Sequence, residues 1–428
     1  MEERRLSSGG CDRHPTTWDR DGERGGYPID MHDPADARSD DAMQVLRDIL
    51  SQPTAPFHEE RVAARIAAYL RAWGIPFVLD AWGNLIAHYR RGGPTRPLLL
   101  MAHMDHPGFE IIAPAGPDDE PCAARLLGGV ARQCFERAEP VAARIYPGGG
   151  DHASNGVAAR VTGYGPPGDG ASGLTLFLTL DDPARAGLVR PGDFGVWDLP
   201  DMEVRDGAIH ARAIDDLAGC ASILLTMRAM AREQRETDVY GVFTRAEEVG
   251  LVGAYAALRG GTLPRDGYIV SLEASKALPG AVQGEGPVIR VGDRASTFCD
   301  EAEGLLRAAA LRLGSPEDGS ASIPAQRQLM SGGQCEATAA VRQGYTTTGL
   351  CFPLGNYHNV GDGFALRPEH IRQDDFLGGV ALLQEAARLL PTYVRDQKQT
   401  EGTVNPRLET MIGQLADTAA HIKEATRG

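Results

Sequence analysis

Apolar residues near the start of the chain recur at helical spacing. Val45, Leu46, Ile49 and Leu50 would share one helix face, and Ser39-Asp40-Asp41 just before them suits a helix N-terminus. Pro53 would stop this helix, and a second apolar pattern with the same period follows over 62–73. Residues 1–40 show almost no apolar periodicity and are rich in Arg, Asp, Gly, Pro and Ser, so they are predicted to form a disordered tail.

Short apolar runs alternate with helical patterns through most of the remaining chain. The run 97–103 is almost wholly apolar, as expected of a strand that is buried on both faces. Similar runs lie at 76–79, 84–88, 239–244, 268–272 and 348–352, and helical patterns lie at 217–232, 250–259, 299–313 and 371–390. Strands that alternate with helices predict an α/β fold, with a mainly parallel sheet and helices on both of its faces.

Residues 111–207 follow a different pattern. Strand-like runs at 141–146, 157–162 and 174–180 are separated by Gly- and Pro-rich turns, and no long helical pattern interrupts them. We therefore predict a small β-barrel-like domain that is inserted into the α/β domain.

The predicted organisation has four parts. A disordered tail (1–40) precedes an α/β domain formed by 41–110 and 208–391, with the inserted β domain at 111–207. Pro391 should end the preceding helix, so that 392–428 would form a polar linker and a last helix, capped by Asn405 with Pro406 in its first turn. One face of that helix would carry Leu408, Ile412, Leu415, Ala419 and Ile422.

Composition narrows the classes of partner and compartment. Among 428 residues, 58 acidic side chains outnumber 43 basic ones, and the net charge of -15 argues against nucleic acid or an anionic membrane as the main partner. No apolar run approaches the ~20 residues that span a bilayer, and the start of the chain lacks the apolar stretch of a signal peptide. The seven cysteines include no C-x-x-C pair, which favours a cytoplasmic location over a disulfide scaffold.

Residues capable of metal and acid-base chemistry follow the predicted buried strands. His103-Met104-Asp105 closes the run 97–103, and residues two apart in a strand face the same side. His103 could therefore bind a metal ion while Asp105 orients its other ring nitrogen. Taken alone, the same pattern also describes a polar strand end with no ligand role.

Two pairs of adjacent carboxylates have both a structural and a chemical interpretation. Asp215-Asp216 opens a predicted helix, where acids commonly act as caps. Alternatively, Asp215 bridges two metal ions while Asp216 supports a metal-bound histidine. Glu247-Glu248 follows the strand 239–243, so one side chain could bind metal while its neighbour faces an attacking water. Such a pair is also common at a solvated helix start.

Glu273 and His358 follow two further predicted strands, and each by itself would suit a turn or an exposed loop. Together, five strand ends offer two histidines and several carboxylates, and ligands of open α/β sheets gather at the C-terminal ends of strands. This mixed ligand set suits zinc, cobalt or manganese, and it leaves open positions for water and substrate.

The order of four short motifs is more specific than any one of them. In chain order they are Ala102–Asp105, Ala213–Asp216, Glu247–Gly250 and Leu251–Ala254. This order resembles the TET-type glutamyl/deblocking aminopeptidases of the co-catalytic metallopeptidase clan, and the similarity runs from about Leu46 to Leu389.

The resemblance implies two divalent metal ions, zinc before cobalt or manganese. His103 and Glu273 would complete one metal site, Glu248 and His358 would complete the other, and Asp215 would bridge them.

The resemblance also implies catalytic roles and an assembly. Glu247 would be the general base, Asp105 would orient His103, and a cis peptide bond would join Asp215 to Asp216. Members of this family assemble through the insert into dimers and dodecamers, so a homo-oligomer is expected.

The chain departs from the family pattern at four places. His106-Pro107 stands where Glu-Val or Glu-Ile is usual, Glu273 stands for the usual Asp, and Leu217 stands for Arg. Gln334–Ala337 replaces a Thr-Asp-Ala segment, with Glu336 at the acidic position, and this departure is expected to shape the substrate pocket.

The predicted function is a metal-dependent hydrolase of amide bonds, most simply an aminopeptidase acting on peptides. A carboxypeptidase or an N-acyl amino-acid deacylase could use the same metal centre. The insert favours the aminopeptidase, because the carboxypeptidases and deacylases usually carry a helix-flanked lid in place of such an insert. A metal-stabilised binding protein without catalysis is a further alternative, and Glu247 beside Glu248 argues against it.

Overall fold

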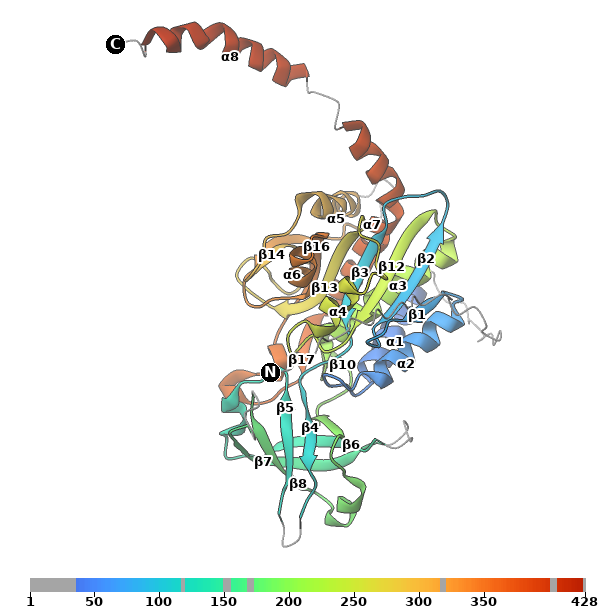
Figure 1. The fold of residues 1–428 in the computed structure, drawn as a ribbon, viewed down its shortest axis with the longest axis vertical. Helices are drawn as coiled ribbons and strands as arrows, with labels where there is room; N and C mark the ends of the chain where they lie inside the picture. Colours follow the sequence, from blue (N-terminus) through green and yellow to red (C-terminus); the bar gives the residue numbers. More distant parts are fainter. Residues whose placement is uncertain are drawn as a thin grey trace, which may run out of the picture.

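The computed structural model describes residues 36–116, 120–148, 155–167, 173–315, 321–400 and 406–425. An α/β body and a smaller β-barrel lie one above the other, and a C-terminal helix, α8 (Pro406–Ala425), projects from the body (Figure 1). No helix among the described residues is long and apolar enough to cross a membrane.

An eight-stranded sheet forms the centre of the α/β body. In spatial order its strands are β1 (Phe77–Leu79), β2 (Leu85–Arg91), β12 (Thr237–Thr244), β3 (Leu98–His103), β13 (Tyr268–Lys276), β16 (Thr346–Leu354), β14 (Val288–Asp293) and β15 (Gln326–Met330). The four central strands, β12, β3, β13 and β16, are parallel, while β2 and β14 run antiparallel to their inner neighbours. The carboxyl ends of the central strands therefore meet at one edge of the sheet.

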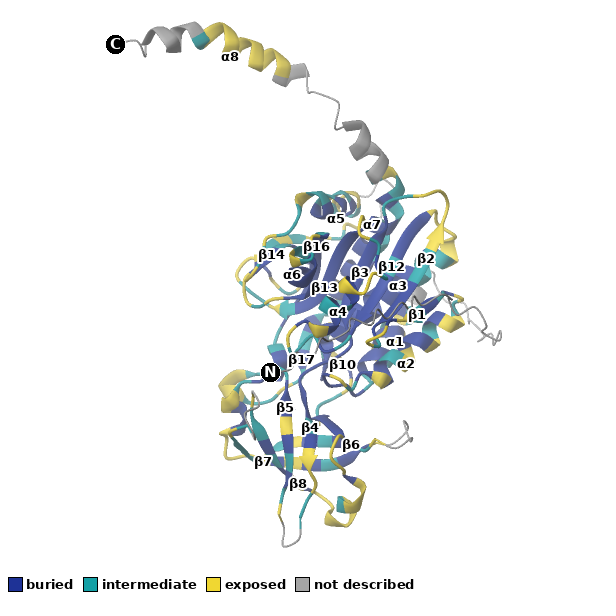
Figure 2. Cartoon of the chain, in the orientation of Figure 1, coloured by how far each residue is buried: buried dark blue, intermediate teal, exposed yellow. Residues whose placement is uncertain are grey.

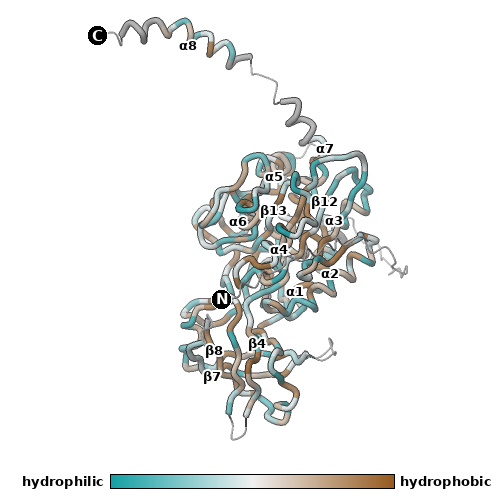
Figure 3. Tube along the Cα trace, in the orientation of Figure 1, coloured by the Kyte–Doolittle hydropathy of each residue, from teal (hydrophilic) through white to brown (hydrophobic). Residues whose placement is uncertain are grey.

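Helices cover both faces of this sheet, which confirms the predicted α/β fold class. One face carries α1 (Asp36–Leu50), α2 (Glu60–Ala72), α3 (Ile214–Glu233), α5 (Asp300–Gly314) and α7 (Gln373–Thr400), and the other carries α4 (Val252–Arg259) and α6 (Glu336–Arg342). The central strands β3 and β12 are almost entirely buried (Figure 2) and largely hydrophobic (Figure 3).

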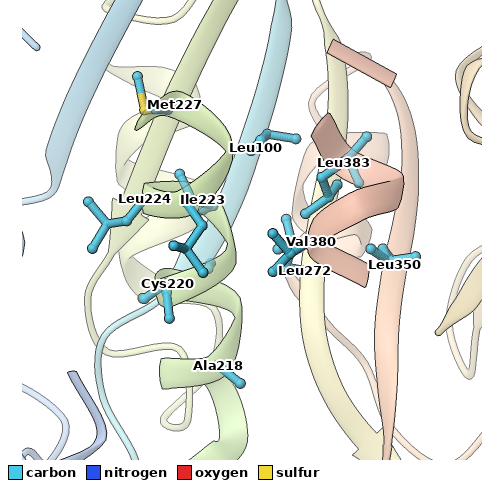
Figure 4. Close-up of a cluster of buried hydrophobic side chains, with 14 of the residues drawn as sticks. Leu100, Ala218, Cys220, Ile223, Leu224, Met227, Leu272, Leu350, Val380 and Leu383 are labelled. Atoms are coloured by element: carbon cyan, nitrogen blue, oxygen red, sulfur yellow. The ribbon is translucent and has the colours of Figure 1, made fainter. Parts of the chain in front are cut away.

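The central strand β3 shows how the sequence places the core. All six of its residues are buried, and they alternate between two clusters. Leu98 and Leu100 pack toward α3 and α7, whereas Leu99 and Met101 pack toward α4 and α6. Figure 4 shows Leu100 among the side chains that join α3 and α7 to the sheet. Each such fully buried side chain contributes about 1.5–3 kcal/mol relative to an exposed one.

The predicted barrel-like insert is a closed six-stranded barrel between β3 and a small second sheet. Its strands, in barrel order, are β4 (Gly108–Ala113), β5 (Cys122–Leu127), β8 (Thr175–Leu180), β7 (Val157–Gly165), β6 (Val141–Tyr146) and β9 (Phe194–Trp197). The barrel has its own apolar core around Phe109 and Trp197. The second sheet consists of β10 (Glu203–Arg205), β11 (Ala208–Ala211) and β17 (Glu369–Arg372).

Two predicted helix boundaries are wrong. Helix α1 begins at Asp36, so Ser39, Asp40 and Asp41 lie inside it and do not cap it. Helix α7 passes through Pro391 and continues to Thr400. A proline inside a helix cannot donate to the carbonyl four residues earlier. Here that carbonyl, of Ala387, accepts a hydrogen bond from Thr237 Oγ1 at 2.8 Å, so the group left over by the proline is satisfied by a neighbouring strand.

Several short elements escaped the sequence analysis. Strands β14, β15 and β17 and helix α6 were not predicted, and the helical pattern placed at 371–390 begins inside β17. The short 3-10 helices η1 (Arg132–Phe135) and η2 (Pro183–Leu188) interrupt the insert. These elements have four to seven residues each, too few for a period to be recognised.

The predictions for the two ends of the chain fall partly outside the described residues. The first 35 residues of the predicted tail and the predicted cap Asn405 lie outside the described residues. The last helix is present as predicted, but its apolar residues Met411, Ile412 and Leu415 are exposed. The six described cysteines are all free thiols.

Candidate metal centre

All five predicted metal ligands lie together at the carboxyl edge of the sheet. His103 ends β3, Glu248 follows β12, and Glu273 lies within β13, which continues three residues beyond it to Lys276. Asp215 stands at the start of α3, and His358 lies in a 3-10 turn, η3 (Tyr357–Asn359), after β16. The prediction that Glu273 follows the end of its strand is therefore wrong. The last β13 residue that pairs with β3 is Ser271, and Glu273 lies two residues beyond it. The side chain of Glu273 can therefore face His103.

The first ligand group is formed by His103, Asp215 and Glu273. The His103 Nε2 atom lies 3.4 Å from Asp215 Oδ1 and 3.5 Å from Glu273 Oε1. All three side chains are buried.

The second ligand group is formed by Asp215, Glu248 and His358. The His358 Nε2 atom lies 3.2 Å from Glu248 Oε1 and 3.7 Å from Asp215 Oδ2. The two carboxylate oxygens of Asp215 are thus divided between the groups, which is the arrangement that a bridging ligand requires. The other ring nitrogen of His358, Nδ1, lies 2.6 Å from the carbonyl oxygen of Gly129, so the segment after β5 of the barrel fixes the orientation of this ring.

The unpaired atoms of these residues fit metal ions. Among the described residues, His103 Nε2, Asp215 Oδ1 and Glu248 Oε1 are buried and have no hydrogen-bond partner. A buried polar atom without a partner costs about 1–3 kcal/mol, and these atoms are the ones that the two groups direct inward. Imidazole and carboxylate ligands without a thiolate suit zinc, cobalt or manganese.

The charges in the two groups oppose one another strongly. Burial and the charge of Glu273 raise the pKa of Asp215 well above its ordinary value. For the histidines, burial lowers the pKa, but the neighbouring carboxylates outweigh it: the pKa of His103 rises well above its ordinary value, and that of His358 rises to about 9 beside Glu248. Both imidazoles are therefore in the protonated, positively charged form at neutral pH in the metal-free protein.

Metal binding at pH 7 should release at least two protons, because a histidine must lose its proton to bind a cation. Since the pKa of His358 is raised to about 9, protons compete with the metal below that pH, and affinity should rise as the pH increases from 6 toward 9. Calorimetric titration of the apoprotein with Zn²⁺ in buffers of different ionisation enthalpy measures this release. A metal affinity that is unchanged between pH 6 and 9 would contradict the prediction.

The predicted general base, Glu247, lies beside both groups. Its Oε2 atom is 4.0 Å from His103 Nε2, and its side chain lines the pocket next to the cluster. Burial raises the pKa of Glu247 well above its ordinary value, which suits a general base.

Asp105 lies beside His103 but makes its strongest contacts elsewhere. The His103 Nδ1 atom is 3.0 Å from the main-chain oxygen of Asp105 and 3.6 Å from its carboxylate. The carboxylate accepts hydrogen bonds from the main-chain N–H groups of Glu247 and Glu248, at 2.9 and 3.1 Å. Asp105 thus positions the glutamate pair as well as the histidine.

A second buried carboxylate, Glu59, which was not predicted from the sequence, supports the same loop. Glu59 Oε1 accepts from the main-chain N–H of Ala246, and Oε2 accepts from Arg245 Nε at 2.7 Å. Ala246 has the left-handed φ of 52°, which a residue with a side chain adopts only with such support. Glu59 directly precedes α2, where an acid is unremarkable, so no sequence signal marked it.

The second carboxylate of the aspartate pair has a different contact from the predicted one. Asp216 Oδ1 accepts from the N–H of Gly219 at 3.2 Å, inside the first turn of α3. Within the described residues we find no hydrogen bond from Asp216 to a histidine. The peptide bond between Asp215 and Asp216 is cis, as the resemblance implied.

A pocket opens directly onto the ligand cluster. Besides Asp215, Glu247, Glu273 and His358, it is lined by Ser275, Lys276, Arg290, Met330, Gly332, Gly333, Gln334 and Tyr357. Arg290 is buried; its Nη1 donates to Ser275 Oγ at 3.1 Å, and its Nε has no partner among the described residues. Arg290 Nη1 also lies 3.9 Å from Glu273 Oε2, so a basic group lines the pocket beside the carboxylate cluster.

Part of the chain matches a known family model. Residues 179–363 match the M42 glutamyl aminopeptidase family, and this segment contains Asp215, Glu248, Glu273 and His358. A curated relative from Acetivibrio thermocellus, named "Putative aminopeptidase", is 24% identical over 286 residues, which are 64% of this chain and 78% of that protein.

Solved structures of TET peptidases have the same fold as this chain. The TET1 peptidase of Pyrococcus horikoshii superimposes with a TM-score of 0.64 at 23% identity, over 81% of this chain and 99% of that chain. A TET aminopeptidase from Thaumarchaeota archaeon SCGC AB-539-E09 gives a TM-score of 0.66 at 21% identity, over 83% and 99% of the two chains.

The family match and the fold together define a metallopeptidase of the aminopeptidase type. More closely, the chain resembles the M42 aminopeptidases, and its fold is that of the TET enzymes. The resemblance that the four sequence motifs indicated is thereby confirmed.

Proposed function

We propose that this protein is an aminopeptidase that binds two divalent cations, zinc before cobalt or manganese, and removes N-terminal residues from peptides. The observation that carries the proposal is the division of the Asp215 carboxylate between two ligand groups with Glu247 beside them. The catalytic domain would comprise 41–110 and 208–391, with 111–207 as the inserted domain.

The chain's own residues supply the acid-base chemistry of this reaction. When bound, two adjacent divalent cations would lower the pKa of an attacking water and polarise the scissile carbonyl. Glu247 takes the proton from the water and passes it to the leaving amine, and a raised pKa suits both transfers. Asp105 and Glu59 hold the main chain of the loop that carries Glu247, so the carboxylate is positioned before substrate arrives.

The pocket favours substrates whose N-terminal residue is acidic. Arg290 lines the pocket with its Nη1 atom 3.9 Å from Glu273 Oε2, and the exposed Lys276 lines the same pocket, so a carboxylate side chain would meet two cations there. The matched family is described as glutamyl aminopeptidase, which is consistent with this preference.

We also propose that the protein is a homo-oligomer that assembles through the inserted barrel. Structures of similar chains are described as a dodecamer and as a tetrahedron or a large octahedral shell. The barrel of this chain exposes large apolar side chains at Ile112 and Leu188, which an interface would cover.

A substrate panel tests the function. We expect the purified protein with Zn²⁺ or Co²⁺ to cleave aminoacyl p-nitroanilides, with the glutamyl and aspartyl compounds at least about tenfold better than leucyl in kcat/KM, since a charged hydrogen bond adds about 1.5–3 kcal/mol. N-acetylated amino acids and N-blocked peptides with a free C-terminus are the controls. Cleavage of these controls in place of the anilides would indicate a deacylase or a carboxypeptidase, and cleavage of neither would leave a metal-binding protein.

A further inference from the structure

The main chain around the proposed bridging ligand, Asp215, is held on both sides of that residue by two buried side chains. The carbonyl oxygen of Asp215 lies 2.6 Å from His106 Nδ1, which donates to it. On the other side, Glu369 Oε2 accepts from the main-chain N–H groups of Ile214 and Asp215, at 2.9 and 3.1 Å. His106 is 2% exposed and Glu369 is fully buried, so neither hydrogen bond competes with bulk water.

The same two side chains reach the segment that carries the second-site histidine. Glu369 Oε1 accepts from the main-chain N–H of His358 at 2.9 Å. His106 Nε2 lies 3.0 Å from Asn359 Oδ1, while Asn359 Nδ2 donates to the carbonyl oxygens of Arg212 and Arg367. The amide of Asn359 is therefore fixed, with its oxygen facing the histidine ring.

This support matters more for one ligand group than for the other. His103 ends β3, and Glu273 lies in the adjacent parallel strand β13, two residues beyond its last pairing with β3 at Ser271, so the sheet holds these two residues near each other. His358 lies in a turn with a left-handed φ of 54°, followed by Asn359 with a φ of 62°. Side-chain hydrogen bonds from outside must hold such a backbone in place.

We propose that His106 and Glu369 are positioning residues that set the distance between Asp215 and His358, and thereby the metal affinity of the second ligand group. This inference rests on the proposed two-metal function. Neither residue is among those that line the pocket, and both contact main-chain groups of the ligands. His106 is also one of the positions at which the chain departs from the family pattern.

Stepwise metal titration tests the inference without measuring activity. The full-length apoprotein is titrated with Co²⁺, followed by its visible absorption, and the two steps are assigned with Glu248→Gln, which removes a second-group ligand. We expect His106→Ala to weaken the second-group step 10- to 100-fold, as for other residues that orient metal ligands, and to change the first-group step less than about threefold. His106→Gln, which keeps one donor, should fall between wild type and alanine.

A matched control comes from the same sheet. His88, on β2, has its Nε2 atom 2.8 Å from Asp238. It lies opposite Tyr240 of the neighbouring strand β12, about four residues, or ~13 Å, before the end of β12 at Thr244, where the ligand cluster begins. His88→Gln should leave both steps unchanged. Asn359→Ala removes the contact between His106 and Asn359 from the other side, and it should weaken only the second-group step. This variant tests the proposal independently if His106→Ala does not fold.

Three results would overturn parts of the proposal separately. An equal loss at both groups, or wild-type affinity in both His106→Ala and Asn359→Ala, would refute positioning while leaving the aminopeptidase function intact. A wild-type protein that binds no Co²⁺ would refute the proposed function itself.

Discussion

Glu247→Gln should lower kcat toward glutamyl p-nitroanilide about a thousandfold while the protein keeps its bound metal. Glutamine preserves the shape of the side chain but cannot accept a proton from water, and general acid-base catalysis contributes roughly 10²- to 10⁴-fold. Glu247 is placed to do this, because it lines the pocket and lies 4.0 Å from the metal-facing nitrogen of His103. Steady-state kinetics combined with metal analysis of the same sample measures both effects.

The neighbouring residue provides a matched control for this variant. Glu248→Gln makes the same chemical change one position later, but Glu248 Oε1 faces His358 within the second ligand group. It should reduce metal content at limiting metal and should regain part of its activity when metal is added in excess. If Glu247→Gln kept near wild-type turnover, or if excess metal restored its activity, Glu247 would not be the base.

Asp215→Asn should have the second largest effect, a loss of affinity at both metal positions of more than about a hundredfold. Asp215 belongs to both ligand groups, with one oxygen toward His103 and the other toward His358. The amide keeps one neutral oxygen and replaces the other with an N–H₂ group that cannot bind a cation.

The stability of this variant should change in opposite directions with and without metal. In the apoprotein, burial and Glu273 raise the pKa of Asp215, so its ionised form is disfavoured, and a neutral amide should raise the melting temperature at pH 8. Metal at about a thousand times its dissociation constant should add about 4 kcal/mol per site to the wild type and little to the variant. Differential scanning calorimetry with and without Zn²⁺ measures both, and a metal-dependent rise equal to that of the wild type would show that Asp215 is not a shared ligand.

The sequence by itself determined the strand ends from which the site is built. A run such as 97–103 is apolar at every position, and only a strand buried on both faces is stable with that pattern, so its polar end must lie at an edge of the sheet. The same argument located Glu247 and Glu248 after β12 and His358 after β16. Parallel central strands then bring these ends together, as the structure shows.

Only the tertiary structure decided which groups support these residues. Glu59, His106 and Glu369 contact main-chain atoms that are more than 100 residues away in the chain, and Thr237 satisfies the carbonyl that Pro391 leaves free in α7. Hydrophobic periodicity specifies which face of an element is buried, but it does not specify which distant segment lies against that face. A buried carboxylate or imidazole is chosen by the N–H or C=O group that packing places beside it, so its role becomes visible once the order of the strands is known.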